Sequence, residues 1–304
     1  MSDISKNTIE RFANKNNLTE LSSPSLIAII NKNPGYNLSR ANDFIRFQHR
    51  INKELLTHRI ITDNQYTAWF SKGDMSPAQI STFVVQFSVF SNLFLIAQLH
   101  KMINADTLEN MHASKQILAN EIGVIFNPGK SHASNASTDR DATDPELVST
   151  QGSIEGGTFR FKAAHFEWLL KLAEKLDLRF NDIGKRQHGT DSTLFFCDEL
   201  VRLYGSEDYL ISQAASYAVE NWAAAGFWDE LVSGFEAYNQ RTRAGLPISF
   251  FTWHSRLEAQ HALHTQEELE EIYFSQAINE DNFIQCGNKM LDGVAAFWDG
   301  LVQH

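Results

Sequence analysis

The chain has 304 residues, 43% of them hydrophobic, which is enough for a substantial buried core. Its formal net charge of −11 at pH 7 argues against binding to nucleic acid or an anionic membrane through a broad basic surface. The two cysteines, Cys197 and Cys286, stand far apart without a CxxC or finger spacing, so neither a disulfide framework nor a zinc ribbon is expected. We expect a cytoplasmic globular protein with no nucleic-acid or membrane partner.

The amino-terminal stretch, MSDISKNTIERFANKNN, lacks the basic and apolar regions of a secretory signal. The most apolar stretch of the chain, residues 83–99, contains several polar residues, among them Gln86, Ser91 and Gln98. These interruptions favour a buried core helix over a membrane span.

Helical periodicity dominates the chain, because prolines are few and apolar residues recur at the spacing of a helix. The predicted helices, in chain order, are residues 24–32, 39–58, 63–71, 76–103, 106–126, 158–177, 190–204, 206–240, 247–264, 266–275 and 279–303. Ser76 before Pro77 is a typical helix start, and the acidic run that ends at Asp208 favours another. The pattern predicts an all-α fold in a single domain, residues 1–304, whose residues 1–60 form an N-terminal helical extension.

Residues 127–157 interrupt this helical pattern. The segment, NPGKSHASNASTDRDATDPELVSTQGSIEGG, is rich in Ser, Asp, Gly and Asn and contains few large apolar residues. Such a composition predicts a long surface loop, with disorder as one interpretation. A lid that orders when substrate binds and a surface decoration without a role are two alternative hypotheses for it.

Three polar residues share one face of the predicted helix at 247–264. His254, Glu258 and His261 are four and three positions apart, which places them within about 60° of one another on an α-helix. Because the same face carries aromatic residues one turn earlier, it belongs to the buried side of the helix. A lone histidine there is usually a hydrogen-bonded core residue, but three titratable groups at this spacing favour a metal site. His264 lies about 80° from His254 near the predicted helix end, so it is left out of the ligand set.

The same test, a carboxylate or histidine inside an apolar helical stripe, selects Glu121, His165 and Glu220. An isolated buried carboxylate is strongly unfavourable unless it becomes neutral, so Glu121 and Glu220 each require a cation nearby. A buried ion pair with an arginine, or a helix assigned with the wrong phase, is the alternative explanation.

Together the six candidates supply three carboxylates and three imidazoles. This mixture suits iron, manganese or zinc and does not suit calcium, which prefers oxygen ligands. A HExxH zinc motif is excluded, because SRL follows His254. Two divalent cations bring four positive charges, of which the carboxylates offset three, so the set balances a di-iron(II) centre with open positions for O2 or a substrate.

In the type and order of these residues, the chain resembles the haem-oxygenase-like di-iron oxidases and oxygenases over about residues 80–300. The family pattern is a Glu on one core helix, a His after it, a Glu on a later helix, and a His-x3-carboxylate-x2-His run. The segments NEIGVIF, AAHFEWLLKLAEKL, AVENWAAAGFWDEL and HSRLEAQH fill these positions in order. Two departures stand out: the 127–157 insertion separates the first Glu from the first His, which makes His132 an alternative ligand, and Glu258 replaces the Asp of many members.

The resemblance implies a helical bundle of haem-oxygenase shape that binds two Fe(II) ions, contains no haem, and uses O2 as co-substrate. It implies oxidation of a small amino-acid-like or fatty-acid-like metabolite, by N-oxygenation, oxidative C–C cleavage or decarboxylation. A homodimer is expected from the fold. The alternatives are a non-catalytic metal-binding or interaction bundle, and a thiaminase-II-like hydrolase in which Cys197 would be the nucleophile.

The substrate pocket is expected inside the bundle, with Phe87, Tyr217 and Phe251 as candidate substrate-binding residues. Phe87 also belongs to a row of phenylalanines at helical spacing, for which plain core packing is the better explanation.

Overall fold

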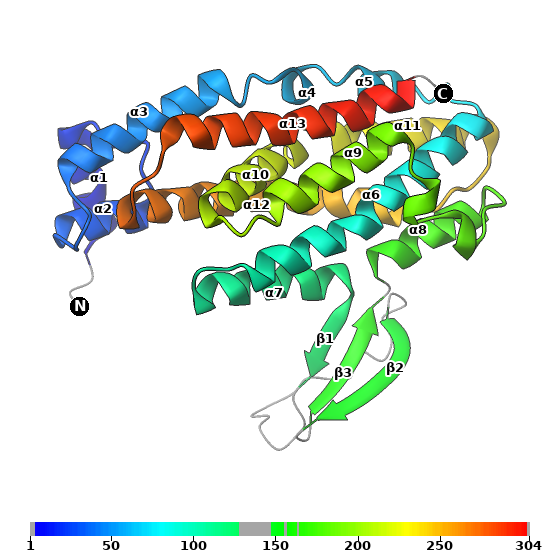
Figure 1. Ribbon diagram of the computed structural model, residues 1–304, viewed down its shortest axis with the longest axis horizontal. Coiled ribbons are helices and arrows are strands. Elements are labelled where there is room, and N and C mark those ends of the chain that lie inside the picture. Colours follow the sequence, from blue (N-terminus) through cyan, green and yellow to red (C-terminus); the bar gives the residue numbers. More distant parts are fainter. Residues whose placement is uncertain (1–3, 128–146, 155–156, 163, 303–304) are drawn as a thin grey trace.

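The computed structural model describes residues 4–127, 147–154, 157–162 and 164–302, and it leaves out the side chains of residues 120, 125–127, 147–154, 157–162 and 257–265. Long helices lie side by side in an elongated bundle, and a small sheet projects from one side of it (Figure 1). The all-α prediction is confirmed for the bundle, and the sheet is an addition to it.

Most of the helices follow one another with short connections, as the sparse turn residues predict. They are α1 (Lys6–Asn16), α2 (Ser23–Ile30), α3 (Leu38–Glu54), α4 (Arg59–Thr62), α5 (Gln65–Phe70), α6 (Pro77–Ile103), α7 (Leu108–Glu121), α8 (His165–Glu174), α9 (Asp191–Glu199), α10 (Tyr209–Ala223), α11 (Phe227–Thr242), α12 (Ser249–Ser275) and α13 (Glu280–Val302), with short 3-10 turns η3 (Phe180–Asp182) and η4 (Arg186–His188) and a π-helical turn η5 (Leu200–Tyr204).

The helices differ from the sequence prediction in several places. Helix α1 was not predicted, and α12 is one helix where two were expected, because no residue inside it breaks the ladder. The predicted helix 206–240 is two helices, α10 and α11. The chain turns between them at Gly226, whose φ of +94° lies in a region that residues with a side chain avoid.

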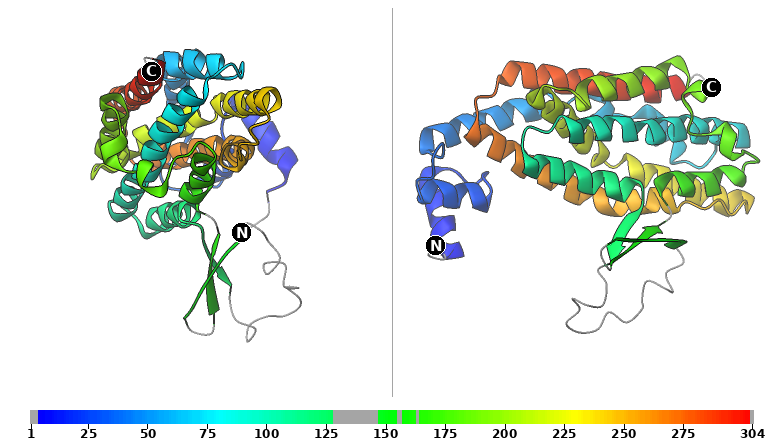
Figure 2. Two further views of the ribbon diagram at one scale, coloured as in Figure 1. Left: turned by 90° about the vertical axis from the view of Figure 1, so that its right-hand side faces the viewer. Right: turned by 60° about the horizontal axis from the view of Figure 1, so that its bottom comes forward.

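The N-terminal helices dock onto the far end of α12. The backbone N–H and the hydroxyl of Ser22 donate to the carboxylate of Glu270 at 3.0 and 2.6 Å, and Glu270 is only 2% exposed. Tyr36 stacks on Phe274 with ring centroids 4.5 Å apart. The guanidinium of Arg40 donates to the carbonyls that end α12. The extension therefore closes one end of the bundle (Figure 2).

Helix α6 is the central helix of the core. It starts with the predicted cap, since the Ser76 hydroxyl accepts from the N–H of Gln79 and the Gln79 side chain accepts from the N–H of Ser76. Among the described helices it alone is long and apolar enough to cross a membrane, but half of its most apolar window is buried inside the protein. Phe83 and Phe87 are fully buried among other aromatic rings. This arrangement agrees with the predicted core helix.

The insertion differs most from the prediction. Strands β1 (Val124–Asn127), β2 (Leu147–Ile154) and β3 (Gly157–Lys162) form an antiparallel sheet in the order β1-β3-β2. The segments VIFN and GTFRFK contain β-branched and aromatic residues that suit strands, but both had been assigned to flanking helices. The prediction of a loop was therefore wrong for residues 147–154, and residues 128–146 lie outside the described residues.

Candidate functional site

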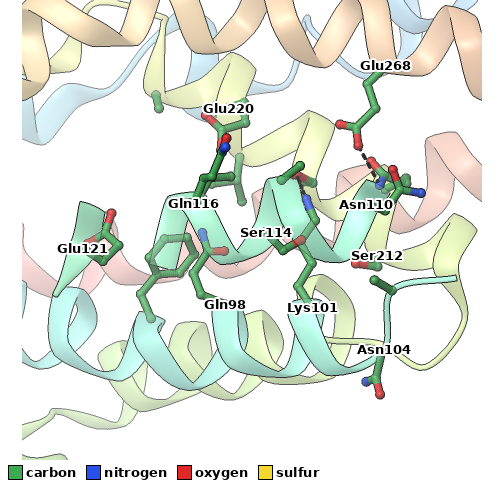
Figure 3. Close-up of a pocket in the computed structure, with 18 of the residues that line it drawn as sticks. Gln98, Lys101, Asn104, Asn110, Ser114, Gln116, Glu121, Ser212, Glu220 and Glu268 are labelled. Carbon is green, nitrogen blue, oxygen red and sulfur yellow. Dashed lines mark hydrogen bonds between the residues drawn. The ribbon is translucent and has the colours of Figure 1, made fainter. Parts of the chain in front are cut away.

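A cavity of about 780 Å³ lies inside the bundle, with walls from α6, α7, α8, α10 and α12. Its lining changes character along α6: Phe87, Phe90 and Phe94 come first, and Gln98 and Lys101 follow toward the end of the helix. Figure 3 shows side chains from several helices converging on this space. The cavity is therefore aromatic at one end and polar at the other.

Four of the six predicted ligands line this cavity: Glu121 from the end of α7, His165 from the start of α8, Glu220 from α10 and His254 from α12. These residues are far apart in the sequence and come from four different helices. The two remaining predicted ligands, Glu258 and His261, belong to α12, but their side chains lie outside the described residues, as does the side chain of His264.

The sheet brings the first two of these residues together. Glu121 precedes β1 by three residues and His165 follows β3 by three, and the two strands pair at their base through Val124 and Phe161. His165 Nδ1 donates to Glu121 Oε2 at 2.7 Å, and their side chains are only 6% and 16% exposed. Residues 44 positions apart in sequence thus become neighbours. The alternative ligand His132 lies in the part of the chain that is not described.

His165 stands at the first position of α8. The helix can begin there because the side chain of Glu167 turns back and accepts from the N–H of Ala164 at 2.8 Å. Aromatic rings surround the imidazole, and the ring of Trp253 lies 4.8 Å away between centroids. The ring is consequently held in place from several sides.

His254 lies beside His165, with ring centroids 4.7 Å apart. Its Nδ1 donates to the carbonyl of Phe250 at 2.7 Å, and its ring stacks on Trp228 at 4.5 Å. A proton fixed on Nδ1 places the lone pair on Nε2, which is the arrangement in which histidines bind metals. His254 is thus oriented by a backbone carbonyl, as metal-ligating histidines usually are.

The donors that line the cavity fit a metal in kind. Two carboxylates and two imidazoles are the ligand types that iron uses in helical bundles. Within the residues that the structure describes, no three His, Cys, Asp or Glu side chains stand close enough together to hold a metal ion. The predicted set would be completed by the two α12 residues whose side chains are not described.

The candidate substrate-binding residues have different surroundings. Phe87 lines the cavity. Phe251 is fully buried, with Phe235 and Phe83 as ring neighbours at 4.9 and 5.8 Å. The hydroxyl of Tyr217 donates to the side chain of Gln266 at 3.0 Å. Only Phe87 of the three is among the described residues that line the cavity.

Comparison with known proteins identifies the architecture. No family model matches the sequence, and no curated protein matches it. A solved structure from Shewanella denitrificans, of a domain of unknown function with a haem-oxygenase-like fold, superposes with a TM-score of 0.57 over 86% of this chain and 92% of the other, at 13% identity. A TenA homolog from Pseudomonas syringae gives a TM-score of 0.52 over 87% of this chain and 93% of the other, at 12% identity. The chain has a haem-oxygenase-like fold.

This haem-oxygenase-like fold contains a further polar group that the sequence analysis missed. Lys101 lines the cavity, and Nζ donates to the hydroxyl of Ser216 at 2.6 Å. Burial lowers the pKa of Lys101. A lysine on the predicted core helix 76–103 was a signal that could have been tested in the same way as the buried carboxylates.

Proposed function

We propose that the protein is a non-haem di-iron oxidase or oxygenase that uses O2 to oxidise a small metabolite. The supporting observation is that four of the six predicted ligands, from four separate helices, line one cavity. A fold shared with a TenA homolog and with a domain of unknown function supports the bundle but does not by itself identify a reaction.

In this proposal Glu121, His165, Glu220, His254, Glu258 and His261 hold two Fe(II) ions, which when bound supply the redox chemistry with O2. The protein itself would orient the ligand side chains and shield the reacting atoms from water. The carbonyl of Phe250 fixes the tautomer of His254, and the aromatic end of the cavity keeps water away from the reacting atoms. Haem is not part of the proposal. A cytoplasmic location and a homodimer belong to the same expectation.

The hydrolase alternative is less well supported. Cys197, the candidate nucleophile, is 3% exposed, and burial raises the pKa of its thiol to about 12. A catalytic cysteine needs a lowered pKa and access to substrate. Among the described residues, the lining of the cavity does not include this cysteine. The role of a small buried apolar side chain explains it better.

The test is metal binding by matched variants. Anaerobic titration with Fe(II) should give two irons per chain for the unmodified protein, and Glu220→Ala and His261→Ala should each lose at least one. His264→Ala, on the same helix as His261, is the control and should keep both. Equal iron content in all four proteins would refute the ligand assignment.

Activity is tested separately by O2 uptake of the iron-loaded protein with free amino acids and fatty acids. A non-catalytic bundle would bind metal without substrate-dependent O2 consumption. Absence of both the two-iron stoichiometry and a transient visible absorption after O2 addition would contradict the proposal.

A further inference from the structure

Lys101 is the one Lys or Arg among the described residues that line the cavity. The cavity otherwise contains carboxylates, among them Glu220 and Glu268, both of which favour the charged form of this lysine. A cationic side chain in the wall of a cavity is a suitable binding place for an anionic group of a ligand.

The lysine is held by a built support. Its Nζ donates to Ser216 Oγ at 2.6 Å and lies 4.7 Å from the centroid of the Tyr204 ring. Tyr204 is fully buried, and its hydroxyl accepts from Gln98 Nε2 at 2.8 Å. It ends the π-helical turn η5, a distortion that occurs frequently at functional sites, and the hydroxyl of Ser212 donates to its carbonyl at 2.6 Å. The ammonium group is therefore held by the Ser216 hydroxyl and by the Tyr204 ring.

This support leaves hydrogen-bonding capacity unused. An ammonium group has three donors, and within the described part of the chain the hydrogen bond to Ser216 is the one that the structure records for Lys101. The ammonium group of Lys101 thus offers further donors to a ligand in the polar end of the cavity.

The position of the lysine limits the size of the ligand. Ser216 and Glu220 are one helical turn apart on α10, which separates their Cα atoms by about 6 Å. Figure 3 shows Lys101 and Glu220 reaching into the same space from opposite walls. A group bound at Lys101 therefore lies close to Glu220, one of the proposed iron ligands.

We propose that Lys101 binds the carboxylate of the substrate, and that Glu268 accepts hydrogen bonds from its amino group. The substrate class is then a small α-amino acid with an apolar side chain, and the aromatic end of the cavity takes the side chain. The carboxylate of Glu268 is held in position for this contact, because Gln213 Nε2 donates to its Oε1 at 3.2 Å. The assignment of a substrate, as opposed to a bound ligand, rests on the proposed di-iron function.

Three probes with the same phenyl ring measure separately how much the carboxylate and the amino group contribute to binding. L-Phenylalanine carries both groups, 3-phenylpropanoate lacks the amino group, and 2-phenylethylamine lacks the carboxylate. Calorimetric titration of the full-length protein, before and after Fe(II) loading, should rank L-phenylalanine above 3-phenylpropanoate and both above the amine.

Lys101→Met should weaken the binding of both acids at least tenfold and leave the binding of the amine unchanged. Lys115→Met, at an exposed lysine on neighbouring α7, should change nothing. Glu268→Gln should remove the preference for the amino acid over the deaminated acid.

The iron content of each variant separates the two proposals. If Lys101→Met binds iron like the unmodified protein and loses the acids, the anchor is supported. If the unmodified protein binds the acids through Lys101 but no iron, the anchor stands and the di-iron function fails. Undiminished acid binding by Lys101→Met, or no acid binding by the unmodified protein at millimolar concentration, would overturn the anchor. Lys101→Gln, checked by circular dichroism, replaces the Met variant if that variant misfolds.

Discussion

The pairing of β1 with β3 gives a sharp test of how the candidate site is assembled. Asn127 and Thr158 face each other at the end of this pair, so a two-residue turn can join them directly. We therefore consider a variant in which residues 128–157 are replaced by Asn-Gly. The variant removes β2 but keeps the pairing of Val124 with Phe161 beside the two predicted ligands.

The deletion changes the free energy of folding in two opposing ways. Shortening a connection of about 30 residues to two makes its closure more favourable by about 2 kcal/mol, and this gain opposes the lost pairing of β2 with β3. We expect the apparent Tm to change by less than roughly 5 °C. We expect the iron content to stay at that of the unmodified protein, because Glu121 and His165 remain in contact.

The matched control carries the same deletion but has Gly and Ser at residues 124–127 and 158–161. Its strands cannot pair well, since these residues have low strand propensity. Iron affinity should then fall by roughly tenfold or more, the usual effect of removing the support of a ligand. Equal iron binding by the two variants, or loss of iron from the Asn-Gly variant with unchanged helical circular dichroism, would refute the idea that the sheet assembles the site.

Three further predictions concern single side chains. Cys197 should react with iodoacetamide at pH 8 at least roughly a hundredfold more slowly in the native protein than after unfolding, because burial raises the pKa of its thiol to about 12; fast native alkylation, read by mass spectrometry, would contradict this. Lys101→Met should be at least as stable as the unmodified protein at pH 7. Since burial lowers the pKa of Lys101, the folded state binds fewer protons than the unfolded state below the ordinary lysine pKa, and the advantage of the variant should shrink as the pH rises toward 10; a difference in Tm that grows with pH would be inconsistent with this. Ser22→Ala should destabilise the protein by about 1–3 kcal/mol in urea unfolding, because the buried carboxylate of Glu270 loses its hydroxyl donor and α2 loses its N-cap; an unchanged midpoint would contradict this.

Much of the bundle could be predicted from periodicity alone. The caps at Ser76 and Asp208 lie where the sequence indicates, because a capping side chain acts on its own next turn. The break between α10 and α11 was missed, since Gly226 follows a run of alanines that continues the helical pattern. The strands were missed because their apolar residues are few and lie next to helices. Sequence patterns therefore predict the features that depend on residues within one or two helical turns, such as helix caps.

The candidate site shows the limit of the same reasoning. Glu121 and His165 were selected as polar residues inside apolar helical stripes, but the structure places them at the last position of α7 and the first of α8. They line the cavity because a sheet folds back between them, a long-range pairing that no helical period expresses. Glu220 and His254 lie inside their helices, where the criterion does apply. A buried titratable group is therefore informative about a cavity even when the predicted phase of its helix is wrong, because its need for a polar partner does not depend on the element that carries it.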